Sequence, residues 1–183
     1  TLIAAGVKVR PDRSVARGVV GQDDRLLVIH ASPPMAKIVA SLNKPSDNFI
    51  AEMVLRTVGM AVNGVGSAGA GVRLVHQLLR AGGAESLPVL TDGSGLTRHN
   101  LVTSRQVTTL LRQMTTHPEF AAYYASLPIA GIDGTLRNRM KSGYAHGNVR
   151  AKTGTMGGVS ALSGYVTTVG SRRLCFAILM NGF

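Results

Sequence analysis

Apolar residues recur at helical spacing through the first two thirds of the chain. The spacing predicts α-helices over residues 34–44, 46–60, 71–83 and 105–117, and a short one near residues 119–125. A proline separates the first two, so we expect them to meet at a polar corner. Ser46 or Asp47 can cap the second helix and Ser104 the fourth. The paired Gly82 and Gly83 are typical of a left-handed end to the third helix.

The last third of the chain changes to strand patterns. After residue 149 the stretches "VRAKTGT", "SALSGYVTTV" and "RRLCFAILMN" predict strands, and "VGSRR" (169–173) predicts a tight turn. Both alternating sets of the last stretch are apolar, which predicts a central strand. "RLLVIHAS" (25–32) predicts another buried strand, and residues 1–10 predict a helix end capped by Gly6 and then a strand. We expect an α/β (α+β) fold in one domain over 1–183, an antiparallel meander with helices on both faces.

Composition is consistent with one folded domain. The chain has 183 residues, 45% hydrophobic and 16% charged, and no apolar run reaches the roughly 20 residues that span a bilayer. The single cysteine, Cys175, excludes an intrachain disulfide. A formal charge of +11 favours an anionic partner such as nucleic acid, anionic lipid or an acidic cell-wall polymer. The arginines are scattered without interleaved aromatic residues, which weakens the nucleic-acid interpretation.

Two polar triplets carry the candidate chemistry. "SDN" (46–48) lies at the corner between two predicted helices, and "KTG" (152–154) lies on a predicted strand. In a helix-and-sheet domain these places can face each other across a cleft that suits a peptide ending in a carboxylate. Ser46 could then pass a proton to a leaving amine, and the Asn48 amide could orient the substrate and a catalytic lysine.

The strand side of such a cleft has its own set of groups. Lys152 would supply a positive charge and Thr153 a hydroxyl for the substrate carboxylate. Gly154 would leave the strand edge clear for another backbone. The Thr155 N–H could form half of an oxyanion hole, while its carbonyl pairs with the substrate amide as an added strand would.

Simpler explanations exist for each of these features. SDN is also a good helix cap, and KTG is an ordinary entry into a strand. Asp92, Ser94 and Gly95 favour a turn, and Asp133 is expected to cap a short helix at 134–136. The five histidines have no paired spacing that would suggest a metal site. We therefore expect no metal and no cofactor.

The two triplets together, in this order, are the combination that accompanies S-x-x-K in penicillin-binding proteins and class A β-lactamases. The segments "NKPSDNFIAEMVLRTVG", "TDGSGLTRHNLVTSRQV", "LPIAGIDGTLRNRM" and "VRAKTGTMGGVSALSGYV" resemble the D-alanyl-D-alanine carboxypeptidase/endopeptidase family of low-molecular-mass, class C penicillin-binding proteins. The likeness runs from about residue 30 to the end. It implies a penicillin-binding/serine β-lactamase-like fold and carries over Ser46 and Asn48 as catalytic residues. It also carries over the third motif, Lys152, Thr153 and Gly154.

The family's first motif, the nucleophilic serine and lysine of S-x-x-K, has one literal match at residues 41–44. We reject it because Ser41 falls at the end of a predicted helix, whereas the nucleophile belongs at a helix N-terminus. The resemblance instead implies a nucleophile upstream of Thr1, and a final family helix beyond Phe183. On this interpretation the chain would be inactive in isolation.

The resemblance implies a periplasmic or extracytoplasmic enzyme that removes the terminal D-alanine from peptidoglycan pentapeptides. Such an enzyme would also cut cross-linked stem peptides and be acylated by β-lactam antibiotics, and no nucleic acid is expected as a partner. Two alternatives from other classes stay open: a non-catalytic module that binds peptidoglycan peptides, and a basic nucleic-acid-binding domain. The charge of +11 is the sole support for the second.

Overall fold

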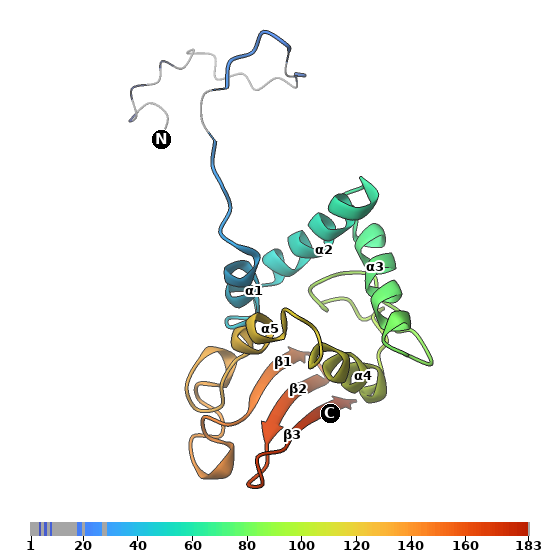
Figure 1. Ribbon diagram of the computed structural model, residues 1–183, viewed down its shortest axis with the longest axis vertical. Helices are drawn as coiled ribbons and strands as arrows, with labels where there is room; N and C mark the ends of the chain where they lie inside the picture. The colour runs from blue at the N-terminus through green and yellow to red at the C-terminus, as the bar shows by residue number, and fades with distance from the viewer. Residues whose placement is uncertain are drawn as a thin grey trace. The chain divides into compact units, whose positions relative to one another are not determined.

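Figure 1 shows the computed structural model of the chain, which describes residues 4, 6, 8, 18, 19, 21–26 and 29–182. The chain divides into two units, Thr1–Ser32 and Pro33–Phe183. All helices and strands of the described residues lie in the second unit. That all 183 residues form one domain stays a prediction.

The strand predicted over 25–32 is wrong for the part of it that is described. Leu27 and Val28 lie outside the described residues, and the others form no strand. Leu26 and Ile29 are 71% and 75% exposed. A buried strand needs neighbours that complete its hydrogen bonds, and no described residue pairs with this segment. The helix end and strand predicted over 1–10 lie mostly outside the described residues.

The predicted helices of the second unit are confirmed with small shifts at their ends. They are α1 (Met35–Asn43), α2 (Asn48–Asn63), α3 (Ala68–Ala81), α4 (Ser104–Met114) and α5 (Phe120–Ser126). Asp47 caps α2 by accepting from the N–H of Ile50. The cap predicted for α4 is wrong by one residue: Thr103 caps it in a reciprocal capping box with Gln106. Gly83, at φ +79°, takes the left-handed conformation after α3.

The three strands form the predicted antiparallel meander. They are β1 (Arg150–Met156), β2 (Val159–Thr167) and β3 (Arg173–Asn181), in the order β1-β2-β3. The register places Lys152 opposite Ser163. The predicted turn over 169–173 is confirmed by hydrogen bonds from the N–H of Thr168 to the carbonyl of Arg172 and from the N–H of Ser171 to the carbonyl of Thr168.

The central position predicted for β3 is not found among the described residues. Within the described residues β3 is an edge strand, and one of its faces is largely open: Leu174, Ile178 and Met180 are 43%, 52% and 53% exposed. Apolar residues on both faces of a strand indicate that both faces can be buried. They do not indicate how many neighbouring strands pair with it, so the pattern could not distinguish an edge strand from a central strand.

Two small cores hold helices and sheet together. On one face of the sheet, where α4 and α5 lie in Figure 1, Tyr165 is fully buried against Leu111 and Leu127. The Tyr165 hydroxyl donates to the carbonyl of Leu111 at 2.8 Å. The opposite face packs Ala151 and its neighbours on the segment with two 3-10 helices, η1 (Gly134–Leu136) and η2 (Gly143–Ala145). These contacts fix strand β1 against residues 127–136.

In the part of the chain that the structure describes, no single helix is long and apolar enough to span a membrane. Helices α2 and α3 reach that length and hydropathy only as a pair, across a 78° bend.

Candidate active site at the start of strand β1

The corner between α1 and α2 is tightly held and strained. The N–H of Asp47 bonds back to the carbonyl of Leu42 at 2.9 Å. Between them Ser46 adopts φ +65°, a left-handed conformation that a non-glycine residue rarely takes. Such strain persists only where surrounding contacts enforce it, and it concentrates at functional sites. The strained conformation at Ser46 therefore marks the corner as a candidate functional site.

The structure brings Ser46 to the lysine of the second triplet. The Lys152 ammonium donates to Ser46 Oγ at 2.6 Å and to the carbonyl of Thr153 at 2.8 Å. Burial lowers the pKa of Lys152 below its ordinary value, because desolvation penalises the charged form. Residues 106 positions apart thus form a short, charge-assisted contact between the helical corner and the sheet.

The free edge of β1 begins at this lysine. Before it, the strand is covered: the N–H of Ala151 donates to the carbonyl of Pro128, and Ile129 forms a bridge with Arg150. Backbone groups of alternate residues point to the same edge, so those of Thr153 and Thr155 point outward with those of Ala151. Within the described residues nothing pairs with β1 beyond Lys152 on that side. An extended peptide could add there.

The remaining predicted residues differ in how closely they join this site. Thr153 Oγ1 lies 2.8 Å from Thr135 Oγ1, which orients its hydroxyl. A Cβ at Gly154 would come 3.3 Å from the Ala161 side chain, so crowding alone does not require glycine. Asn48, the exposed first residue of α2, makes no side-chain hydrogen bond to the described residues. The structure thus joins Ser46, Lys152 and Thr153 directly, and not Asn48.

The loop over 91–100 is organised by Asp92, as the predicted turn role requires. Its carboxylate accepts from four partners: Asn100 Nδ2, Ser94 Oγ, and the N–H groups of Gly95 and Thr97. Burial would raise the pKa of Asp92, but these hydrogen bonds together hold it below its ordinary value. The loop is tied to α2, where Glu52 accepts from two of its N–H groups, and to the β1–β2 turn, where Arg98 donates to the Gly157 carbonyl at 2.8 Å.

The literal S-x-x-K match at 41–44 does not form a nucleophile and base. Ser41 is exposed in the last turn of α1, and Lys44 points elsewhere. Its ammonium donates to Asp133 Oδ2 at 2.6 Å and to the carbonyl of Leu127 at 2.7 Å. Asp133 occupies the predicted N-cap position of η1, but its side chain makes no capping hydrogen bond, because its other oxygen accepts from the N–H of Ile129 instead. Sequence reasoning missed this ion pair, since its partners are 89 residues apart.

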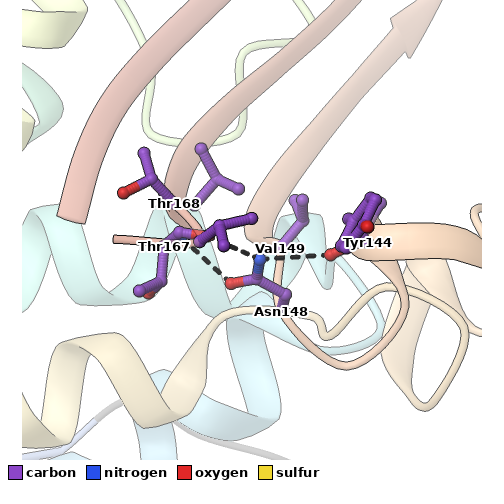
Figure 2. A pocket seen from close by; sticks show the side chains of 8 residues that line it. Tyr144, Asn148, Val149, Thr167 and Thr168 are labelled. Atoms are coloured by element: carbon purple, nitrogen blue, oxygen red, sulfur yellow. Dashed lines mark hydrogen bonds between the residues drawn. The ribbon is translucent and has the colours of Figure 1, made fainter. Parts of the chain in front are cut away.

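Two hollows of the surface lie apart from the Ser46–Lys152 contact. One, of about 580 Å³, lies at the end of β2 beside Asn148, whose amide bonds Thr167 and the Tyr144 carbonyl (Figure 2). The other, of about 780 Å³, lies between α4 and the start of β3. Neither contains a residue of the two triplets. Among the described residues no three His, Cys, Asp or Glu side chains gather in a metal-binding arrangement.

Solved structures with the same arrangement identify the class of fold. Penicillin binding protein 4 from Haemophilus influenzae matches with a TM-score of 0.79 and 32% identity, over 84% of this chain and 35% of that one. A complex of that protein with a β-lactam matches with a TM-score of 0.78. An extended-spectrum β-lactamase, 16% identical, matches with a TM-score of 0.60 over 80% of this chain and 55% of its own. The expected penicillin-binding/serine β-lactamase-like fold is confirmed.

Sequence relatives narrow the class to a family. A D-alanyl-D-alanine carboxypeptidase from an Actinomadura species is 43% identical over 88% of this chain and 31% of its own length. The carboxypeptidase DacB of Haemophilus influenzae is 32% identical over 88% of this chain and 35% of its length. The model of the D-Ala-D-Ala carboxypeptidase 3 (S13) family matches residues 1–183, and the chain belongs to that family. It spans about one third of the length of these curated relatives.

Proposed function

We propose that this chain forms one side of the active site of a serine-type D-Ala-D-Ala carboxypeptidase. The enzyme would act on peptidoglycan stem peptides through an acyl-enzyme, cut peptide cross-links in the same cleft and bind β-lactams. The observation that carries the proposal is the 2.6 Å contact between Lys152 Nζ and Ser46 Oγ at the free edge of β1. Family membership and the β-lactam complex of a relative support it.

The contact suits proton transfer during acylation and its reversal. A hydroxyl that accepts from an ammonium has its own proton directed away from that ammonium, toward the cleft. Ser46 can therefore hand its proton to the leaving amine while the Lys152 ammonium gives a proton to Ser46 Oγ, which leaves Ser46 neutral and Lys152 as the free amine. Because burial lowers the pKa of Lys152, the ammonium releases its proton more readily than an exposed lysine would. Asn48, the first residue of α2, would orient the substrate amide.

Strand β1 supplies the binding groups. In this proposal the substrate lies antiparallel to the free edge that starts at Lys152, with its C-terminal carboxylate near the ammonium and the Thr153 hydroxyl. Gly154 leaves room for the approaching backbone. The outward N–H of Thr155 points to the position where a tetrahedral intermediate would carry its oxyanion.

The nucleophilic serine is assigned to a segment outside these 183 residues. Within the chain, Ser41 is exposed at the end of α1 and Lys44 is committed to Asp133. Ser46 lies before the Asp47 cap, outside α2, and its hydroxyl already accepts from the Lys152 ammonium. Because the substrate is cell-wall peptide, we place the enzyme outside the cytoplasm, in the periplasm where the cell has one.

The test compares two reactions in the full-length protein, with Lys152→Ala against Lys141→Ala as a matched control on an exposed lysine. We expect Lys152→Ala to lower kcat/KM for an acylated Lys-D-Ala-D-Ala peptide by about a hundredfold, because a charged hydrogen-bond donor to the carboxylate is lost. Acylation by benzylpenicillin should slow as well, and the control should change neither rate. Unchanged rates for both substrates in Lys152→Ala would contradict the assignment.

A further inference from the structure

The literal S-x-x-K lysine, Lys44, has a place in the fold that catalysis does not explain. It ends α1, two residues before Ser46 in the chain. Its side chain is 24% exposed and its ammonium lies between the Asp133 carboxylate and the Leu127 carbonyl. Its own carbonyl accepts from the N–H of Thr135 at 3.0 Å. The side-chain ammonium and the backbone carbonyl of Lys44 therefore both bond to residues 127–135.

That same segment is tied to the strand of the candidate site. Pro128 and Ala130 bond to the start of β1, through Ala151 and Val149 respectively. Thr135 meets the Thr153 hydroxyl at 2.8 Å. Residues 127–135 thus lie between the helical corner and strand β1 and contact both.

The approach of corner and segment is close enough to constrain the backbone. A Cβ on Gly134 would come within 2.6 Å of the Lys44 carbonyl oxygen and 3.0 Å of Pro128. Asn43 adds a further tie, donating to Ser126 Oγ at 2.8 Å. Ser46, two residues after Lys44, has its left-handed conformation. A shift of the corner relative to β1 would therefore move the Ser46 hydroxyl away from Lys152.

We propose that Lys44 and Asp133 are positioning residues whose ion pair fixes the Ser46 hydroxyl against the Lys152 ammonium. The inference rests on the proposed function for its catalytic meaning, but the geometry it concerns is measurable without catalysis. Lys44 acts by holding the corner between α1 and α2 in place. Asp133 acts by fixing residues 127–135, since its carboxylate also accepts from the N–H of Ile129. Neither side chain needs to touch substrate.

The first experiment titrates Lys152 in the full-length protein by NMR of the lysine side chains, with Lys152→Arg to assign its signal. The variants are Lys44→Met, Asp133→Asn and Lys44→Arg, and Lys37→Met serves as an exposed control on the same helix. Loss of positioning should expose Lys152 to water in both Lys44→Met and Asp133→Asn, and so raise its pKa toward the ordinary value of 10.5. We expect the acid dissociation constant of Lys152 to fall by about threefold or more.

The direction of the change in the pKa of Lys152 distinguishes a positioning effect from the direct electrostatic effect of removing a charge. Through space alone, removal of the Asp133 charge would lower the pKa of Lys152, and removal of the Lys44 charge would raise it. A rise in Asp133→Asn, with Lys44→Arg and Lys37→Met close to wild type, supports the proposal. A fall in Asp133→Asn, or an unchanged pKa in both variants while they remain folded, overturns it. If Lys44→Met does not fold, Asp133→Asn alone decides.

The second experiment measures acylation of the full-length protein by benzylpenicillin. We expect the acylation step of Lys44→Met and Asp133→Asn to be about tenfold slower with little change in the initial binding constant, and Lys44→Arg to recover most of the rate. If the binding constant changes and the acylation step does not, positioning is refuted. If wild type is not acylated at all, the proposed function fails, and the titration still decides the role of Lys44 and Asp133.

Discussion

The substitution Gly134→Ala tests how closely the helical corner approaches the segment before β1. Gly134 has φ +55°, where an alanine costs about 1 kcal/mol. Its new Cβ would lie 2.6 Å from the Lys44 carbonyl oxygen, so the two must separate by about 0.8 Å to reach ordinary contact. That movement breaks the bond from the Thr135 N–H, worth about 1 kcal/mol, and adds about 1–3 kcal/mol of overpacking. We expect a total loss of about 3–5 kcal/mol.

Gly143→Ala is the matched control. Gly143 has φ +71°, and a Cβ at this position would have no atom within 4 Å. Its alanine variant therefore measures the cost of the left-handed backbone alone, about 1 kcal/mol. Urea unfolding of the two variants and the wild-type chain gives the difference directly. A loss in Gly134→Ala within about 0.5 kcal/mol of that in Gly143→Ala would refute the close contact. Residues 127–135 would then not hold the corner in place by steric contact.

Three further substitutions test other parts of the structure. Asp92→Asn should destabilise the chain at neutral pH. Because the pKa of Asp92 in the folded chain lies below 3.8, the carboxylate stabilises the fold above that pH. This stabilisation is lost as the pH falls through the lower, folded value. The difference in unfolding free energy between wild type and Asp92→Asn should therefore be smaller at pH 3 than at pH 7. Tyr165→Phe should cost about 1 kcal/mol in urea unfolding, since it leaves the Leu111 carbonyl without its 2.8 Å donor. Arg98→Ala should speed hydrogen exchange in the β1–β2 turn, because the bond to the Gly157 carbonyl is removed; unchanged exchange would contradict that tie.

Local patterns predicted the helices and the meander because each is encoded within a few residues. Alternation and helical spacing gave α1 to α5 and β1 to β3 with shifts of a few positions at their ends. The cap of α4 was missed by one residue, since Thr103 and Ser104 are both good caps and only the Gln106 side chain decides between them. The edge position of β3 depends on pairing between strands, which its own sequence does not record.

The site divides in the same way. The two triplets are local motifs, and their contact through Ser46 and Lys152 follows once the corner and β1 exist. The Lys44–Asp133 ion pair has no local signal, because Asp133 looks like a helix cap and Lys44 like part of a catalytic motif. Charge partners 89 residues apart are found from the fold, not from spacing.

The most direct test of the account is intact-mass spectrometry after incubation with benzylpenicillin, on the 183-residue chain and on the full-length protein, followed by peptide mapping of the acylated serine. We expect the full-length protein alone to gain the mass of the drug, at a serine outside these residues. Acylation of the 183-residue chain at Ser41 or Ser46 would contradict the account, because it would make a nucleophile of a residue assigned to the helix end or to proton transfer.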